Sequence, residues 1–163
     1  MAQIDLRNAL VEIIDGSGTP KVLEVKIGEG TLTFNEKRNM EYVRNRRQVA
    51  FVRTGDDEPM DVSFDFIWEF LRSISPAPIT VEEAIKGSAN AVTAGWVTSG
   101  ADPCEPYCVD IRITYTPPCP GVDNEVITLK EYRWEGGNHD LKAGTVASTG
   151  KCKIAVADLA RAA

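Results

Sequence analysis

The stretch DVSFDF, residues 61–66, decides the fold class, because apolar and polar side chains alternate strictly along it. In an extended chain, Val62, Phe64 and Phe66 lie on one side, and the three polar residues between or beside them lie on the other. This period of two is typical of a strand in an antiparallel sheet that has one buried face and one solvated face. We therefore expect a β protein.

The same alternation recurs on both sides of this stretch, and turn residues separate the runs. The expected strands are KVLEVKI (21–27), TLTF (31–34), CVDIRITY (108–115), EVITLKEYRW (125–134) and KCKIAV (151–156). Two segments have helical character, IWEFLRS (67–73) and TVEEAIKG (80–87). In the second, Thr80 is suited to cap the start of the helix and Gly87 to end it. The prediction is a mainly β protein, an antiparallel β-sandwich or barrel with one or two short flanking helices.

Length and composition favour a single globular domain over residues 1–163, with 43% hydrophobic and 26% charged residues. The net charge of −6 argues against a general nucleic-acid binder, which must neutralise phosphates. No apolar run approaches the roughly 18 residues of a membrane-spanning helix, and the start of the chain does not follow the pattern of a signal peptide. We expect synthesis in the cytoplasm and reduced thiols.

A cationic segment interrupts the strand pattern at about residues 35–48, where we expect a long extended loop. Residues 36–53 contain six cations and two anions, a balance of +4, whereas residues 56–69 contain six anions and no cation. Long ordered loops in compact domains usually carry function. The two blocks could simply be solvated in a monomer, but between identical copies they are complementary, and such heterologous contacts form rings or open filaments.

Catalytic motifs are absent from the sequence. The single histidine, His139, precedes Asp140, and we interpret it as a turn residue between two strands, because no nucleophile motif accompanies it. The acidic residues of GDDEP (55–59) fit a turn. The three tryptophans, at positions 68, 96 and 134, fit core or interface anchors better than a sugar platform. We expect no enzyme activity and no cofactor.

The cysteines form the remaining candidate site. Cys104, Cys108 and Cys119 could start a structural zinc site, but the expected strand between the second and the third spans about 20 Å. Ordinary reduced thiols are the favoured interpretation, and no metal is expected. Cys152 shares a predicted strand face with Ile154 and Val156, which is typical of a small core residue.

Two long stretches resemble the tail tube proteins of long-tailed bacteriophages. TLTFNEKRNMEYVRNRRQVAFVRTGDDEPMDVSFDFIWEFL (31–71) resembles the front half of these proteins. GADPCEPYCVDIRITYTPPCPGVDNEVITLKEYRWEGGNHDLKAGTVASTGKC (100–152) resembles the back half, and the order is the expected one. The resemblance implies a β-sandwich whose copies form hexameric rings. The rings stack into a hollow tube that conducts phage DNA during ejection.

The resemblance also implies partners and a location. The chain would contact itself within and between rings, a tape-measure protein, and the tail terminator and tail-tip proteins, while phage DNA passes through transiently and no membrane is involved. It would reside in the tail of the virion after assembly in the host cytoplasm. The alternatives are a tail terminator, capping or other virion ring protein on the same fold, or a zinc-stabilised ligand-binding β-module.

Under this interpretation the cationic loop is an arm that reaches another copy. The arm residues are Lys37, Arg38, Met40, Tyr42, Arg44, Arg46 and Arg47. The acidic residues that would complement the arm or face the tube lumen are Asp56, Asp57, Glu58, Asp61 and Asp65. A negative lumen wall would repel phosphate and let DNA slide. The polar residues of 61–65, or those of 110–114, would line it.

Overall fold

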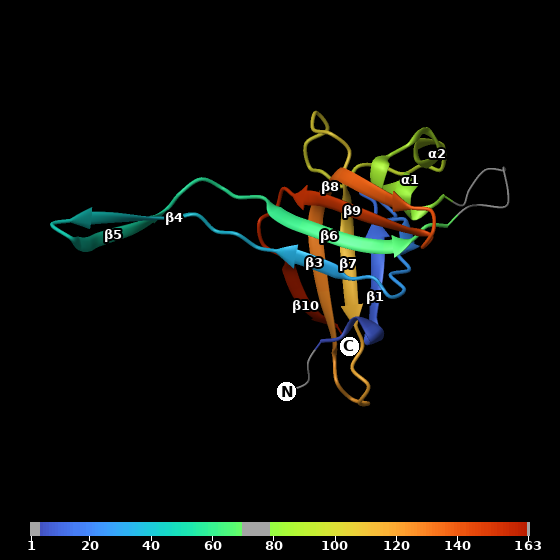
Figure 1. Cartoon of the computed structure of the whole chain (residues 1–163), viewed down its shortest axis with the longest axis horizontal. Helices are drawn as coiled ribbons and strands as arrows, with labels where there is room; N and C mark the ends of the chain where they lie inside the picture. Colours follow the sequence, from blue (N-terminus) through green and yellow to red (C-terminus); the bar gives the residue numbers. More distant parts are fainter. Residues whose placement is uncertain (1–3, 70–78, 163) are drawn as a thin grey trace.

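A computed structural model describes residues 4–69 and 79–162 and shows a β body from which a thin arm projects (Figure 1). The body contains the 3-10 helix η1 (Leu6–Asn8), the helices α1 (Val81–Lys86) and α2 (Ala89–Thr93), and the strands β1 (Ala9–Ile14), β2 (Val22–Glu24), β3 (Leu32–Asn35), β6 (Met60–Ile67), β7 (Val109–Tyr115), β8 (Asn124–Asp140), β9 (Thr145–Cys152) and β10 (Asp158–Ala162). The arm contains β4 (Met40–Asn45) and β5 (Gln48–Thr54).

The body strands form one sheet in the order β2-β1-β7-β8-β9-β6-β3, and β10 also pairs with β8. All of these pairings are antiparallel. The mainly β, antiparallel fold with short flanking helices is therefore confirmed.

The long strand β8 bends the sheet into two layers. Its first part pairs with β7 and β10, and its second part pairs with β9. At the bend Glu131 has a φ of 58°, and a register shift follows between Trp134 and Gly136. Such irregularities are how strands turn corners between layers. In Figure 1, β1 and β7 accordingly run steeply across β6 and β9.

The segment after β2 closes the opposite corner of the sheet. The backbone N–H of Val25 donates to the carbonyl of Val11 in β1 at 2.8 Å, and the N–H of Ile67 in β6 donates to the carbonyl of Lys26 at 2.9 Å. Adjacent residues thus bond to strands of different layers. The segment that follows β2 therefore links β1 in one layer to β6 in the other.

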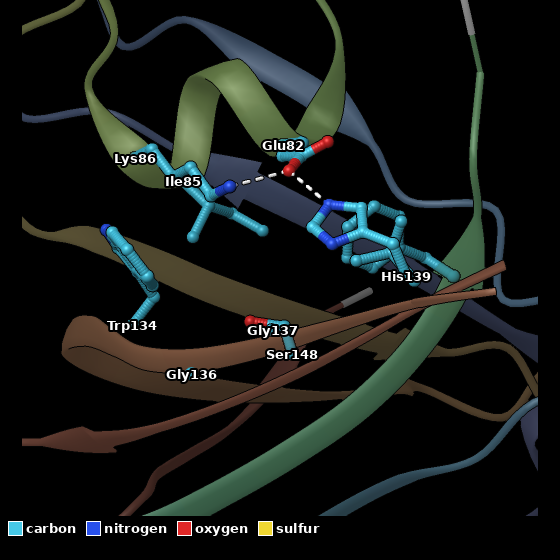
Figure 2. A pocket seen from close by; sticks show the side chains of 10 residues that line it. Glu82, Ile85, Lys86, Trp134, Gly136, Gly137, His139 and Ser148 are labelled. Atoms are coloured by element: carbon cyan, nitrogen blue, oxygen red, sulfur yellow. Dashed lines mark hydrogen bonds and ion pairs between the residues drawn. The ribbon is translucent and has the colours of Figure 1, made fainter. Parts of the chain in front are cut away.

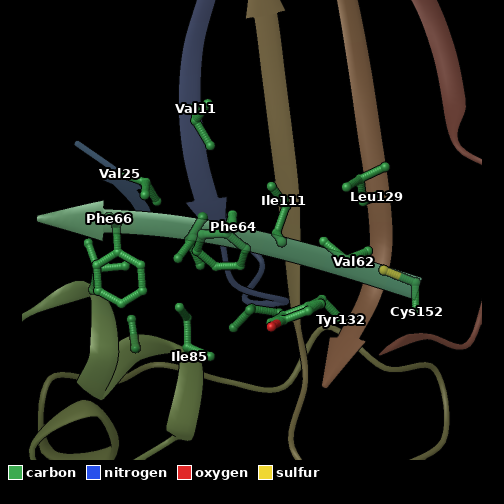
Figure 3. Close-up of a cluster of buried hydrophobic side chains, with 14 of the residues drawn as sticks. Val11, Val25, Val62, Phe64, Phe66, Ile85, Ile111, Leu129, Tyr132 and Cys152 are labelled. Carbon is green, nitrogen blue, oxygen red and sulfur yellow. The ribbon is translucent and has the colours of Figure 1, made fainter. Parts of the chain in front are cut away.

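The core lies between the two layers and beneath α1 (Figure 3). The alternation predicted for 61–66 is confirmed, because Val62, Phe64 and Phe66 are buried. Phe64 packs against Tyr132 at a ring-centroid distance of 5.7 Å, and the Tyr132 hydroxyl bonds to Ser148 Oγ at 2.9 Å. Burial raises the pKa of Tyr132 to about 12. The buried hydroxyl is satisfied, so the ring stabilises the core at no polar cost.

Helix α1 has the predicted caps. The side chain of Thr80 accepts a hydrogen bond from the N–H of Glu83 at 3.3 Å. Gly87 ends the helix with a φ of 62°, a conformation that favours glycine. In the other predicted helical stretch, Ile67 instead ends β6, Trp68 and Glu69 are not helical, and residues 70–73 lie outside the described residues.

Two predicted strands extend beyond the observed ones. Of residues 21–27 only Val22–Glu24 form a strand, β2. Strand β9 ends at Cys152, and residues 153–156 form bends in which Ile154 and Val156 are exposed. Cys152 is buried in the core as expected, but it does not share a strand face with those two residues. Burial raises the pKa of its thiol to about 12. Strands β1 and β10 were not among the strands expected from the sequence.

Candidate inter-subunit interface

The arm is a β-hairpin, β4–β5, on a stalk of two non-strand segments, held away from the body (Figure 1). The stalk consists of residues 36–39 and 55–59, which join at the bond from the Gly55 N–H to the Asn39 carbonyl at 2.8 Å. A Cβ on Gly55 would lie 2.6 Å from the Asn39 side chain, so a larger residue there would have to displace that side chain. The predicted extended loop at 35–48 is thus a hairpin that continues to Thr54.

Two arginines form the turn at the tip of the hairpin. Arg46 and Arg47 have φ values of 51° and 71°, as a two-residue connection of the primed type requires. Asn and Gly are the usual residues there, because other side chains cost about 1 kcal/mol or more per residue in this conformation. Backbone strain of this kind is concentrated at functional sites. Here the strain places two guanidinium groups at the apex, with Arg44 close by in β4.

The hairpin exposes apolar side chains on both faces. Tyr42 pairs with Val52 and Val43 pairs with Phe51, so the two pairs lie on opposite faces. Tyr42 is 61% exposed and Phe51 is 55% exposed. Met40, the other apolar residue predicted for the arm, is half-buried. Three exposed residues of β5 were missed from the sequence, although a β-branched and aromatic run marks them: Val49, Phe51 and Val52.

The acidic residues occupy two places. Asp56 and Asp57 are exposed and Glu58 is half-buried on the returning segment of the stalk. Asp61 and Asp65 lie on the outer face of β6, half-buried, opposite the core residues of that strand. The arm therefore carries cations at its tip and anions at its base. Asp56 follows Arg47 by nine residues, which corresponds to nearly 30 Å of extended chain at about 3.3 Å per residue.

Lys37 and Asp61 are the two predicted site residues that the fold brings together. The Lys37 Nζ forms an ion pair with Asp61 Oδ2, and Lys151 Nζ lies 3.9 Å from Asp61 Oδ1. The hydrogen bond from Lys37 holds the pKa of Asp61 below its ordinary value, and the same bond raises the pKa of Lys37. This ion pair ties the stalk to the body. Arg38, Arg44, Arg46 and Arg47 are exposed.

The outer face of the layer formed by β3, β6 and β9 is polar. A shallow groove on it is lined by residues that include Thr33, Asn35, Asp61, Ser63, Glu135 and Lys151. The alternative wall on β7 is also polar, and there Arg112 Nη2 lies 3.0 Å from Glu12 Oε1 on β1. Strand β6 itself contributes Asp61 and Asp65 to its outer face, whereas β7 contributes Asp110 and Arg112.

His139 lies in β8 and binds helix α1 (Figure 2). Its Nε2 is 2.5 Å from Glu82 Oε1, and Lys86 Nζ lies 2.6 Å from the same oxygen. Lys86 also lies over the Trp134 ring, 5.2 Å from the centroid. Asp140 instead accepts hydrogen bonds from turn amides. The expected position of His139 in a turn is therefore corrected to a strand.

The cavity beside this cluster is water-sized, at about 10 Å³. Phe66, Ile85 and Val146 form its apolar lining, together with Gly136 and Gly137 of β8. A cavity of this size has no room for a substrate. The arrangement of His139, Glu82 and Lys86 instead fastens α1 onto the bent sheet.

The cysteines are spread along the fold. Cys108 is buried at the start of β7, with its Sγ 3.4 Å from the hydroxyls of Thr98 and Ser99. Cys104 is exposed on the preceding loop, and Cys119 is exposed beyond the other end of β7. In the described ranges, no group of three or more His, Cys, Asp or Glu residues is arranged to hold a metal ion.

No protein-family model matches this sequence, and no curated protein is significantly similar to it. Among residues 4–69 and 79–162, no helix is both long and apolar enough to span a membrane.

Proposed function

We propose that the chain is a structural subunit of a bacteriophage tail tube, in which hexameric rings stack into a hollow tube that conducts DNA. The observation that carries this proposal is the arm, whose apolar side chains and arginine tip are left uncovered by the chain's own body. An isolated two-stranded hairpin is only marginally stable in water. The arm therefore needs a surface on another molecule.

Charge supports an identical copy as that molecule. The tip carries Arg44, Arg46 and Arg47, while the stalk and the outer face of β6 carry the acidic residues. A cationic tip on one copy and an anionic surface on the next are complementary, and the two surfaces differ. Contacts between different surfaces propagate into rings or open assemblies rather than closed dimers.

The polar β6 face supports a wall along which DNA slides. Asp61 and Asp65 point away from the core, Asp61 in contact with Lys37 and Lys151, and carboxylates on such a wall repel phosphates. In this proposal the protein has no catalytic step and belongs to the virion tail. Its partners are copies of itself, a tape-measure protein around which the tube assembles, and the terminator and tip proteins that close it.

Charge reversal at the arm tip tests the proposal. We expect Arg46→Glu with Arg47→Glu to leave a folded monomer that no longer forms tubes, as seen by light scattering and negative-stain microscopy. Arg7→Glu with Lys142→Glu changes the charge equally on exposed body residues and should leave assembly intact. Assembly of the native chain should also weaken as salt rises from about 0.05 to 0.5 M, because screening reduces exposed charge contacts.

Two outcomes would count against it. Full-length tubes from the arm variant would show that the tip does not carry assembly. A native chain that stays monomeric at every concentration, and also when mixed with the other tail components, would remove the tube assignment itself.

A further inference from the structure

Strand β10 leaves a five-residue sheet edge of the body open. It pairs with β8 from Asp158↔Thr128 to Ala162↔Asn124. Within the described part of the chain, no strand pairs with its other side. The other edges are the short strands β2 and β3 and the second part of β8, residues 134–140, which pairs only with β9 and beside which α1 packs through the contact of Glu82 with His139. An open edge with unpaired N–H and C=O groups is a template for strand addition.

This edge has only part of the usual protection against strand addition. Proteins defend open edges with charged side chains, proline, bulges or very short strands. Here the two charges of β10 are engaged with β8, because Arg161 Nε lies 3.1 Å from Glu125 Oε1 and Asp158 Oδ2 lies 3.5 Å from Lys130 Nζ. The register of β10 contains no shift, and its sequence contains no proline.

An apolar shelf accompanies the open edge. Leu159 pairs with Ile127, so both side chains lie on the same face of the sheet. Ile127 packs against the core, but Leu159 is 68% exposed, because the second layer does not cover β10. Ile154 and Val156, just before the strand, are also exposed. At this edge, the sheet face that packs on the core elsewhere is exposed to solvent.

We propose that β10 is the receptor for the arm of a second copy, which adds β4 or β5 to the open edge as a further strand. The inference rests on the proposed function and names the surface that the arm meets. The arm offers free edges and apolar side chains on both faces, so it can continue the sheet and cover Leu159. Backbone pairing gives the affinity, and the apolar contacts set the register.

The arm is a better partner for β10 than a second β10 is, because both β10 and the arm expose surface that a partner must cover. Pairing of β10 with another β10 would be isologous, would close a dimer and would leave the arm uncovered. Pairing of the arm with β10 covers both bare surfaces with one contact. The contact is heterologous, so each copy gives an arm and receives one.

Disulfide trapping between two differently labelled chains tests this pairing. In a Cys104→Ser, Cys119→Ser background, one chain carries Ala160→Cys, and the other carries a single cysteine at one position within 41–45 or 49–53. The two are mixed, assembled and oxidised. We expect crosslinked heterodimers at alternate arm positions of one strand, since same-face neighbours on paired strands lie about 5 Å apart.

A point variant gives a second measurement. Leu159→Lys should raise the protein concentration needed for assembly about tenfold or more while the monomer's melting temperature stays unchanged, because the side chain is exposed in the monomer. Val92→Lys on α2, where the side chain is 64% exposed, is the matched control.

The outcomes separate the two proposals. Tubes that form without any arm–β10 crosslink, or Ala160→Cys homodimers in the absence of an arm cysteine, would overturn this inference and leave the tube assignment standing. If the background substitutions alone prevent assembly, the same mapping is done with the native cysteines retained and the crosslinks identified by mass spectrometry. A native chain that never assembles would overturn both.

Discussion

In the body, strands β6 and β7 bury every second side chain, whereas strands β4 and β5 of the arm bury none. Both regions contain β-branched and aromatic residues in extended chain. The difference is that the body's strands meet a second layer, and the arm's strands meet only each other. A β pattern in the sequence therefore predicts an extended chain, but not whether the chain's own fold covers it.

The contrast gives the arm its role. Burying a large apolar side chain stabilises by about 1.5–3 kcal/mol, and the arm forgoes that gain for Tyr42, Val49, Phe51 and Val52 within the chain. Apolar surface of this kind, held on a stalk and tipped with arginines, is typical of an interaction site. The apolar side chains of the body stabilise the chain's own fold, whereas those of the arm are available for contact with another molecule.

The largest difference between body and arm is expected when one phenylalanine in each is replaced by alanine. Phe64→Ala in the core should destabilise the folded monomer by about 3–5 kcal/mol, because it removes a fully buried ring and leaves a cavity. Phe51→Ala in the arm should change the monomer's free energy of unfolding by less than about 0.5 kcal/mol, since the ring is exposed. It should instead raise the concentration for assembly about tenfold or more. Denaturant unfolding and light scattering measure the two effects.

The opposite pattern would refute the distinction. If Phe51→Ala lowered the monomer's stability as much as Phe64→Ala, the arm would be covered by its own chain in solution. If Phe51→Ala assembled like the native chain, its apolar surface would have no part in the contact.

The arginine turn offers a test in which stability and function should move in opposite directions. Replacing Arg46 by Asn and Arg47 by Gly relieves the left-handed strain, so the hairpin amides should exchange with solvent about five- to tenfold more slowly, equivalent to about 1 kcal/mol. Assembly at low salt should weaken by about threefold or more, because two charges are lost. Hydrogen exchange and light scattering provide the readouts.

The charge-preserving Arg46→Lys, Arg47→Lys variant is the control for the turn. It should retain much of the assembly while the strain remains. An Asn-Gly turn that assembles as well as the native chain would mean that the arginines are placed there for a reason other than the contact.

The sequence predicted the body's strands where one face is buried and the other solvated. DVSFDF and CVDIRITY follow this rule, and both are confirmed as strands β6 and β7. Strand β1 was not predicted, because ALVEII places apolar residues on both faces and blurs the alternation. Strand β10, DLARA, was not predicted either, because its alanines favour helix and only pairing with β8 makes it extended.

The sequence predicted the positive charge of the arm but not its hairpin structure. Net cationic character and apolar residues at 40 and 42 are visible in the sequence and mark an exposed segment. The hairpin is not visible, because its turn is Arg-Arg where the usual signal is Asn-Gly. The β5 residues were missed because VAFV (49–52) is a short continuous apolar run without alternation, and such a run does not say whether its side chains are buried by the chain itself or by a partner. Contacts between distant segments, such as Lys37 with Asp61 and His139 with Glu82, depend on the fold and cannot be read from spacing.

The smallest expected effect concerns the contact of Glu82 and Lys86 in α1 with His139 in β8, which lies in the body and far from the arm. Burial acts to raise the pKa of Glu82, but hydrogen bonds from Lys86 and His139 outweigh it and leave the pKa below its ordinary value of 4.5. A carboxyl whose pKa is lowered by folding adds stability above its unfolded pKa and loses it as the pH falls through the folded pKa. Glu82→Gln should therefore be less stable than the native chain by about 0.5–1 kcal/mol above pH 5, with the difference vanishing in acid. Denaturant unfolding across pH 3–7 measures it. If the free energies of unfolding of the two proteins differed by the same amount at every pH, the contact of Glu82 with Lys86 and His139 would not stabilise α1 in solution. If Glu82→Gln also reduced assembly at pH 7, a body contact would affect the function assigned to the arm.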